Sequence, residues 1–196
     1  MRLAVLQVAR RLDADSQTCA FAEALARAVA QGAEVVLSAG MPEVGVAAHT
    51  EGAELLGTII RLDGDAALDP VEYTKACAKE PDVLLLSPGA ESELQAEAVL
   101  EVAIGLSTSC AGLVVVLENA GADVGEPGHG GSAIVVLGEV VAEALSDDDV
   151  LIAEVPIPVP SPGPRSPLPE LPLILEQRLA HHRGERLATE YPADLT

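Results

Sequence analysis

The sequence is poor in aromatic side chains and in basic residues. Phe, Trp and Tyr together make up 2% of its 196 residues, so Ala, Val and Leu must build the hydrophobic core. Lys and Arg number 11 against 31 Asp and Glu, which gives a formal net charge of −20. Nucleic-acid binding depends on Lys and Arg side chains that neutralise phosphates, so this balance argues strongly against a nucleic-acid partner. It argues almost as strongly against an anionic membrane surface.

Cysteines are few, and long apolar runs are missing. Cys19, Cys77 and Cys110 lie far apart, with no Cys-x-x-Cys pair and no Cys/His cluster. This spacing predicts neither a disulfide framework nor a structural zinc site, and each cysteine is expected to be a small structural thiol. No stretch approaches the roughly 18 consecutive apolar residues that a membrane helix needs. The N-terminal apolar run is too short for a signal peptide, so we expect a cytoplasmic protein. We also expect no metal and no cofactor.

Strand-like apolar runs alternate with helical periodicities along residues 1–155. Leu3–Val8 is a short apolar run typical of a buried strand, Ser16–Gln31 has apolar residues at helical spacing, and Val35–Leu37 is a second strand. This order of elements predicts an α/β fold. The remaining predicted elements are strands at Leu55–Leu62, Val83–Leu86, Leu113–Leu117 and Leu151–Val155, helices at Val71–Glu80 and Ala90–Leu106, and a hairpin of Ala133–Leu137 with Val140–Ala144.

The C-terminal part of the chain has a different composition. Eight of the 14 prolines lie between Pro156 and Pro172, which predicts an extended, polyproline-like arm. We expect the arm to pack along its own fold or a second subunit; the alternative is binding to an aromatic groove of another protein. A helix is expected over Leu173–Ala188. The chain is therefore divided into a domain at 1–155 and a C-terminal extension at 156–196.

Several short strings, in their order along the chain, resemble the carbon–nitrogen hydrolase (nitrilase) superfamily. They are Leu3–Gln7, Gly32–Leu37, Gly57–Asp63, Pro81–Pro88, Val114–Gly121, Gly130–Ala144 and Leu151–Val155. The resemblance covers about residues 1–40 and 55–155. It implies an α-β-β-α sandwich, in which two β layers lie between two helical layers. It also implies self-association, because proteins of this family commonly dimerise through a helical face.

The matching positions lack the catalytic residues of that family. The family uses a Cys nucleophile, a Glu general base and a Lys that stabilises the oxyanion. Arg61 stands where the resemblance places the Cys. Ala39-Gly40 stand where it places the Glu, and Glu43 lies three residues beyond. The Lys would lie between these two positions, but Met41–Ile60 contains no lysine. Only 20 residues separate Gly40 from Arg61. The chain is therefore expected to be a nitrilase-like sandwich with its central segment deleted.

Some polar side chains are still expected at the strand ends, where α/β folds bind ligands. The candidate ligand-binding residues are Arg61, Asp63, Glu118, Asn119 and His129. We predict that Arg61 is at least partly buried and is paired with Asp63, with Glu118 or with a small bound anion, because an unpaired buried guanidinium is costly. His181 and His182 are expected to be solvated at the end of the last helix.

These observations lead to two hypotheses about function. The first is a catalytically degenerate nitrilase-like protein that acts as a binding, scaffolding or regulatory partner, as a homodimer or with another protein. The second is an enzyme that re-uses the pocket for amide or nitrile hydrolysis or for acyl transfer. Its reacting group would be Cys77, Asp63 or Glu118.

Overall fold

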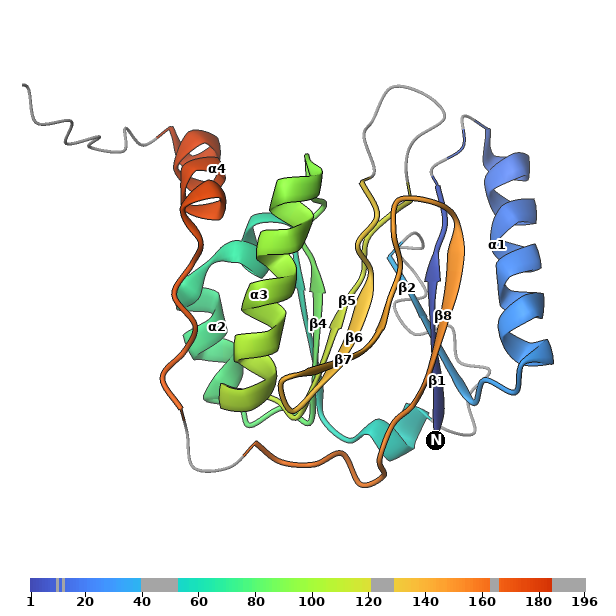
Figure 1. Ribbon diagram of the computed structural model, residues 1–196, viewed down its shortest axis with the longest axis horizontal. Helices are drawn as coiled ribbons and strands as arrows, with labels where there is room; N and C mark the ends of the chain where they lie inside the picture. Colours follow the sequence, from blue (N-terminus) through green and yellow to red (C-terminus); the bar gives the residue numbers. More distant parts are fainter. Residues whose placement is uncertain (10, 12, 40–52, 121–128, 163–165, 185–196) are drawn as a thin grey trace, which may run out of the picture.

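Two β-sheets lie face to face, and helices cover the outer side of each sheet (Figure 1). The structure is a computed structural model that describes residues 1–9, 11, 13–39, 53–120, 129–162 and 166–184. The small sheet has the order β2-β1-β8 and consists of β1 (Arg2–Gln7), β2 (Val35–Ser38) and β8 (Asp149–Glu154). The large sheet has the order β3-β4-β5-β6-β7 and consists of β3 (Ile59–Asp63), β4 (Val83–Ser87), β5 (Leu113–Val116), β6 (Ala133–Val136) and β7 (Glu139–Glu143).

Three of the described α-helices begin after a residue whose side chain accepts from a free amide group of the first turn. α1 (Ala14–Ala30) begins after Asp13, and α3 (Glu93–Ser109) begins after Ser92, whose side chain accepts from the Gln95 amide. α2 is Pro70–Cys77, α4 is Leu173–Arg183, and two short 3₁₀ turns are η1 (Ala53–Leu56) and η2 (Gly64–Leu68). Among the described residues, no helix combines the length and the apolar character needed to cross a membrane.

Parallel and antiparallel pairings occur in both sheets. β1 pairs with β2 in parallel and with β8 antiparallel. In the large sheet β3, β4 and β5 run parallel, whereas β6 and β7 continue antiparallel. β1, β2, β4 and β5 are buried along nearly their whole length. Strands covered on both faces need continuous apolar runs, which explains the unbroken Val and Leu strings of this sequence.

Three apolar clusters correspond to the three interfaces of the sandwich. Between the sheets, β1 and β2 side chains such as Leu3 and Leu37 meet Leu85 and Val115 of the large sheet. A second cluster lies between the large sheet and α2, α3 and α4, and a third lies between the small sheet and α1. The order is helix, sheet, sheet, helix, which confirms the predicted α-β-β-α sandwich.

Several predicted boundaries differ from the observed ones. The strand expected at Leu55–Leu62 is wrong in its first part, because residues 53–56 form η1 and Gly57 turns the chain at φ +73° before β3 begins. α3 begins at Glu93 rather than Ala90, since its cap is Ser92. The second helix ends at Cys77, and Glu80 adopts a positive φ of 51°. α4 ends at Arg183, and residues 185–188 of the expected helix lie outside the described residues.

The proline-rich arm runs beneath the sandwich from β8 to α4 (Figure 1). The Pro160 carbonyl lies so close to Gly112 that no side chain would fit there, and the Pro169 ring packs in the same way against Gly105 of α3. Leu175 of α4 is fully buried in the cluster over the large sheet. The described parts of the arm therefore pack against α3 and the start of β5.

Candidate functional site

The middle of β3 carries Arg61 at the position that the resemblance assigns to the nucleophile. Arg61 is in register with Leu85 of β4, whose side chain belongs to the core between the sheets. Its Nε donates to Oδ1 of Asp63 at 2.6 Å, and the two side chains are 28% and 57% exposed. Residues two apart on a strand point to the same side, which makes this pairing possible. The prediction of a partly buried Arg61 paired with Asp63 is confirmed.

Glu118 lies in a different environment from Arg61. It follows β5, is 3% exposed, and its Oε1 accepts from the Ala90 amide at 3.0 Å. Burial raises the pKa of the Glu118 carboxyl to about 7, although the Ala90 hydrogen bond and the charge of Arg178 lower it in part. The Glu118 amide in turn donates to the Ser132 hydroxyl at 3.0 Å. Its charged neighbour is thus Arg178 of α4, not Arg61.

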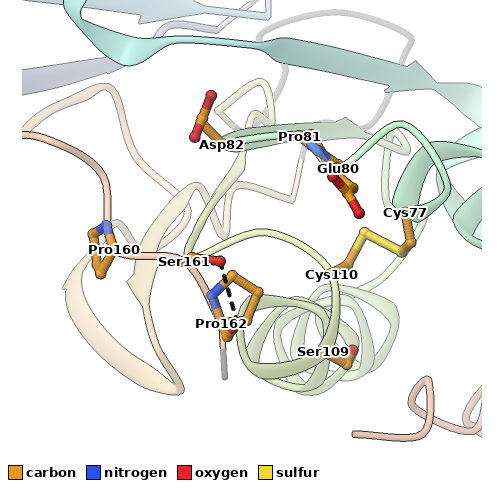
Figure 2. Close-up of a pocket in the computed structure, with 10 residues that line it drawn as sticks. Cys77, Glu80, Pro81, Asp82, Ser109, Cys110, Pro160, Ser161 and Pro162 are labelled. Carbon is orange, nitrogen blue, oxygen red and sulfur yellow. Dashed lines mark hydrogen bonds between the residues drawn. A yellow bond between two sulfur atoms is a disulfide. The ribbon is translucent and has the colours of Figure 1, made fainter. Parts of the chain in front are cut away.

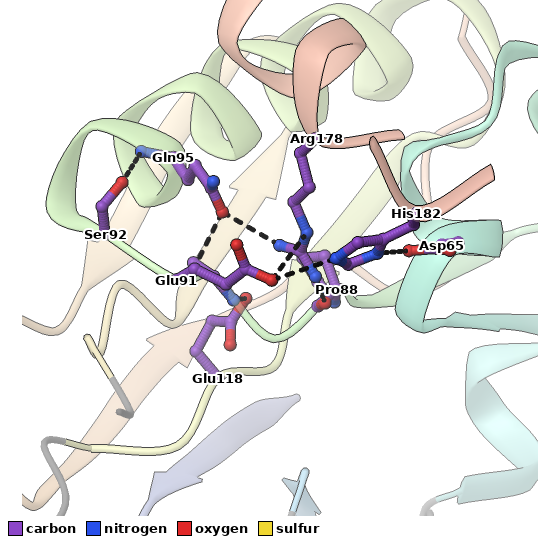
Figure 3. Close-up of polar contacts among 9 residues, drawn as sticks. Asp65, Pro88, Glu91, Ser92, Gln95, Glu118, Arg178 and His182 are labelled. Carbon is purple, nitrogen blue, oxygen red and sulfur yellow. Dashed lines mark hydrogen bonds and ion pairs between the residues drawn. The ribbon is translucent and has the colours of Figure 1, made fainter. Parts of the chain in front are cut away.

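Arg178 anchors α4 to the loop between β4 and α3 (Figure 3). It is 8% exposed, and its Nη2 donates to the Pro88 carbonyl at 2.8 Å while its Nη1 donates to Gln95 Oε1 at 3.1 Å. Its Nε lies 3.6 Å from Glu91 Oε1 and has no hydrogen-bond partner among the described residues. A buried guanidinium of this kind is tolerated because two carbonyl-type acceptors and a carboxylate surround it.

The same face of α4 binds two further acidic residues. His182 Nδ1 lies 2.9 Å from Asp65 Oδ1, its Nε2 lies 3.3 Å from Glu91 Oε1, and Arg183 Nη2 lies 2.5 Å from Asp69 Oδ2. The expectation that His182 is only solvated was therefore wrong, because it is exposed yet also contacts two carboxylates. Sequence reasoning missed this network. The available signal was a basic helix at the end of a strongly acidic chain, which must find acidic partners.

Of the remaining candidates, Asn119 follows β5 and His129 precedes β6. The Asn119 carbonyl accepts from the Gly130 amide at 3.0 Å. His129 lines a cavity of about 310 Å³ together with Glu93, Glu97 and Glu143 among others. The structure thus brings Glu118 and Asn119 near the loop that carries His129. Glu118 and Asn119 are separated from Arg61 and Asp63, because β4 lies between β3 and β5. Ligand binding by these residues stays a prediction.

The cysteines are arranged differently from the prediction. Cys77, at the end of α2, forms a disulfide with Cys110, the C-cap of α3, across a sequence separation of 33 and a Cα–Cα distance of 4.9 Å. The expectation of unpaired structural thiols was wrong for these two residues, because only the packing of α2 beside α3 brings them together. The hypothesis of Cys77 as a free nucleophile is therefore also wrong. Cys19 is the free cysteine and is exposed on α1.

The other positions of the catalytic set are only partly described. Ala39 follows β2 and is partly buried, whereas Gly40, Glu43 and most of the segment without lysine lie outside the described residues. Within the described parts of the chain, no group of three or more His, Cys, Asp or Glu residues is arranged to hold a metal ion.

No protein-family model matches the chain, and no curated protein matches its sequence. Solved structures of an amidase from Nesterenkonia sp. AN1 do match it. A mutant with acrylamide added at its active-site cysteine gives a TM-score of 0.62 at 16% identity, over 80% of this chain and 93% of that chain. A second mutant, described as belonging to the nitrilase superfamily, gives 0.61 at 15% identity, over 80% and 92%. A likeness at this identity shows the fold, so the chain has the fold of the nitrilase-superfamily amidases.

Proposed function

We propose that this chain is a catalytically degenerate nitrilase-fold protein that acts as a binding or regulatory partner. The observation that carries the proposal is the pair formed by Arg61 and Asp63 in β3, where the resemblance places a nucleophile. A guanidinium stays protonated and offers no lone pair for attack. The cysteines supply no substitute, because Cys77 and Cys110 are bonded to each other and Cys19 lies on α1.

Ammonia release from a panel of short amides and nitriles tests this proposal. We expect no turnover from the wild-type chain or from Arg61→Cys, because the family's base and lysine positions are also lost. A thiol-reactive probe should label Cys19 alone, and Cys19→Ser should abolish the labelling. Turnover that disappears on substitution of a single residue would overturn the proposal, as would amide hydrolysis by Arg61→Cys.

The proposed ligand at Arg61 is a small anion. Asp63 holds the Nε edge of the guanidinium, and the Nη edge offers the paired donors that suit a carboxylate or a phosphate. Titration with acetate and inorganic phosphate, followed by NMR, should shift signals of β3 in the wild type. Arg61→Gln should lose this response, whereas Asp63→Asn should keep or strengthen it because a competing carboxylate is removed. Equal responses of wild type and Arg61→Gln would contradict the assignment.

One observation favours the alternative, an enzyme with a new set of reacting groups. Glu118 is a buried carboxyl whose pKa, about 7, suits a general acid or base near neutral pH. The hydrogen bond that its Oε1 accepts from the Ala90 amide, in the loop between β4 and α3, is structural. Any turnover found in the substrate panel and lost in Glu118→Gln would favour this alternative.

Self-association and a cytoplasmic location complete the proposal. Homodimerisation through a helical face is what the resemblance implies, and it fits a binding or scaffolding role. Analytical ultracentrifugation over a range of concentrations tests it: a single monomeric species at every concentration would contradict it.

A further inference from the structure

The Cys77–Cys110 disulfide lies in the wall of a cavity of about 310 Å³, at the edge of the large sheet where β4 and β5 begin (Figure 2). Residues 80–82 and the arm residues 160–162 form the other walls. Most structural disulfides of a core are shielded from other thiols by packing. Here, Cys77 and Cys110 both line a space large enough for a small organic molecule.

The two cysteines of the disulfide differ in exposure. Cys77 is partly exposed, whereas Cys110 is 6% exposed. Thiol–disulfide exchange requires a thiolate to approach one sulfur along the line of the bond, so access selects the sulfur that is attacked. The geometry therefore favours attack at Cys77, with Cys110 as the leaving group.

The charges around the cavity select the kind of thiol. Glu80 and Asp82 are its charged lining residues, and no Lys or Arg is among the described residues that line it. The chain also carries a net charge of −20. An anionic thiol is repelled by this field, whereas a cationic thiol is attracted.

We propose that this cavity is a thiol-exchange site, at which Cys77 forms a mixed disulfide with a small cationic aminothiol. The aminothiol thiolate attacks Cys77 Sγ, a new S–S bond forms, and the electron pair of the Cys77–Cys110 bond passes to Cys110 Sγ, which takes a proton from water. A second aminothiol then attacks the mixed disulfide, which yields the free dithiol form of the protein and the oxidised disulfide of the aminothiol. Exchange releases α2 from its covalent link to α3. This site is independent of the proposed function at β3.

The experiment uses the full chain with Cys19→Ser, which removes the exposed free thiol. Cysteamine and glutathione are added separately at low ionic strength, the reaction is quenched by alkylation, and peptides are mapped by mass spectrometry. A short peptide disulfide provides the reference for the intrinsic reactivity of the two thiols. We expect the adduct on Cys77, and a cysteamine preference about tenfold above that of the peptide, which shrinks in high salt. Glu80→Gln, which keeps the side-chain size, should reduce the preference.

Three outcomes would overturn the proposal. The first is an adduct on Cys110 in place of Cys77. The second is a preference for cysteamine no greater than that of the peptide disulfide. The third is exchange that occurs only at the rate of global unfolding, measured by circular dichroism, which would make the disulfide purely structural.

Discussion

The two outer faces of the sandwich are stabilised in different ways. Among the described helices, α1 covers the small sheet, and the apolar cluster between them combines Phe21 with small residues such as Ala24 and Ala28. The large sheet is covered by α2, α3 and α4, which are cross-linked by a disulfide and by the hydrogen bonds of Arg178. The comparison teaches that an aromatic-poor chain with a large charge excess supplements apolar packing with covalent and polar contacts where three helices must be held together.

The largest effect is expected at the disulfide of the three-helix face. Replacing both Cys77 and Cys110 by Ser should lower the free energy of unfolding by about 3–4 kcal/mol, since a link across a sequence separation of 33 restricts the unfolded chain. Urea unfolding of the variant and the wild type measures the difference. Cys19→Ser is the matched control and should change stability by less than about 0.5 kcal/mol, because Cys19 is exposed. An equal effect of both variants would contradict the distinction.

The next largest effect is expected at the single-helix face. Phe21→Ala should cost about 3 kcal/mol, because Phe21 is the aromatic side chain of the described apolar cluster and the small residues around it cannot fill the cavity. Thermal unfolding by circular dichroism checks this value. Val29→Ala on the same helix is the control: Val29 is exposed, so its removal should have almost no effect. A cost below about 1 kcal/mol for Phe21→Ala would show that α1 contributes little to the fold.

A pH-dependent effect is expected at Glu118, beneath the three-helix face. Its pKa is raised from 4.5 to about 7 in the folded state, so the folded protein binds this proton more tightly than the unfolded chain does. The stability that the protonated Glu118 carboxyl contributes to the fold is therefore fully present below about pH 4.5, and it is lost as the pH rises through about 7. Glu118→Gln stays neutral, and its stability relative to wild type should rise by about 2–3 kcal/mol between pH 4 and pH 8. Urea unfolding at both values tests this; a pH-independent difference would contradict it.

The smallest effect is expected at the exposed end of α4. Arg183→Gln should lower stability by about 0.5 kcal/mol, since its ion pair with Asp69 lies near the surface and is screened by salt. Arg178→Gln should cost several times more, because it leaves the Pro88 carbonyl without its donor inside the structure. Chemical unfolding in low and high salt measures both. Equal losses of stability in Arg183→Gln and Arg178→Gln would contradict the prediction that the buried arginine contributes more than the exposed one.

Local sequence patterns were sufficient for most of the fold. Apolar runs predicted β1, β2, β4 and β5, and the periodicity of residues 16–31 predicted α1. The segment at 55–62 was the main error, because an apolar run does not show that Gly57 turns the chain. The Arg61–Asp63 pair was predictable for the same reason as the strands, since it depends on the two-residue period of one strand.

The network around Arg178 and the pairing of Cys77 with Cys110 could not be read from local patterns. Arg178 meets Pro88 across 90 positions of the chain, and the cysteines meet only because α2 packs beside α3. Sequence alone determined the alternation of strands and helices and the acidic charge, because these follow from residue identity and short-range spacing, whereas the sandwich was implied by the family resemblance. Tertiary structure alone decided which polar groups are buried together, because long-range contacts depend on how helices pack on the sheets, which short-range periodicity does not specify.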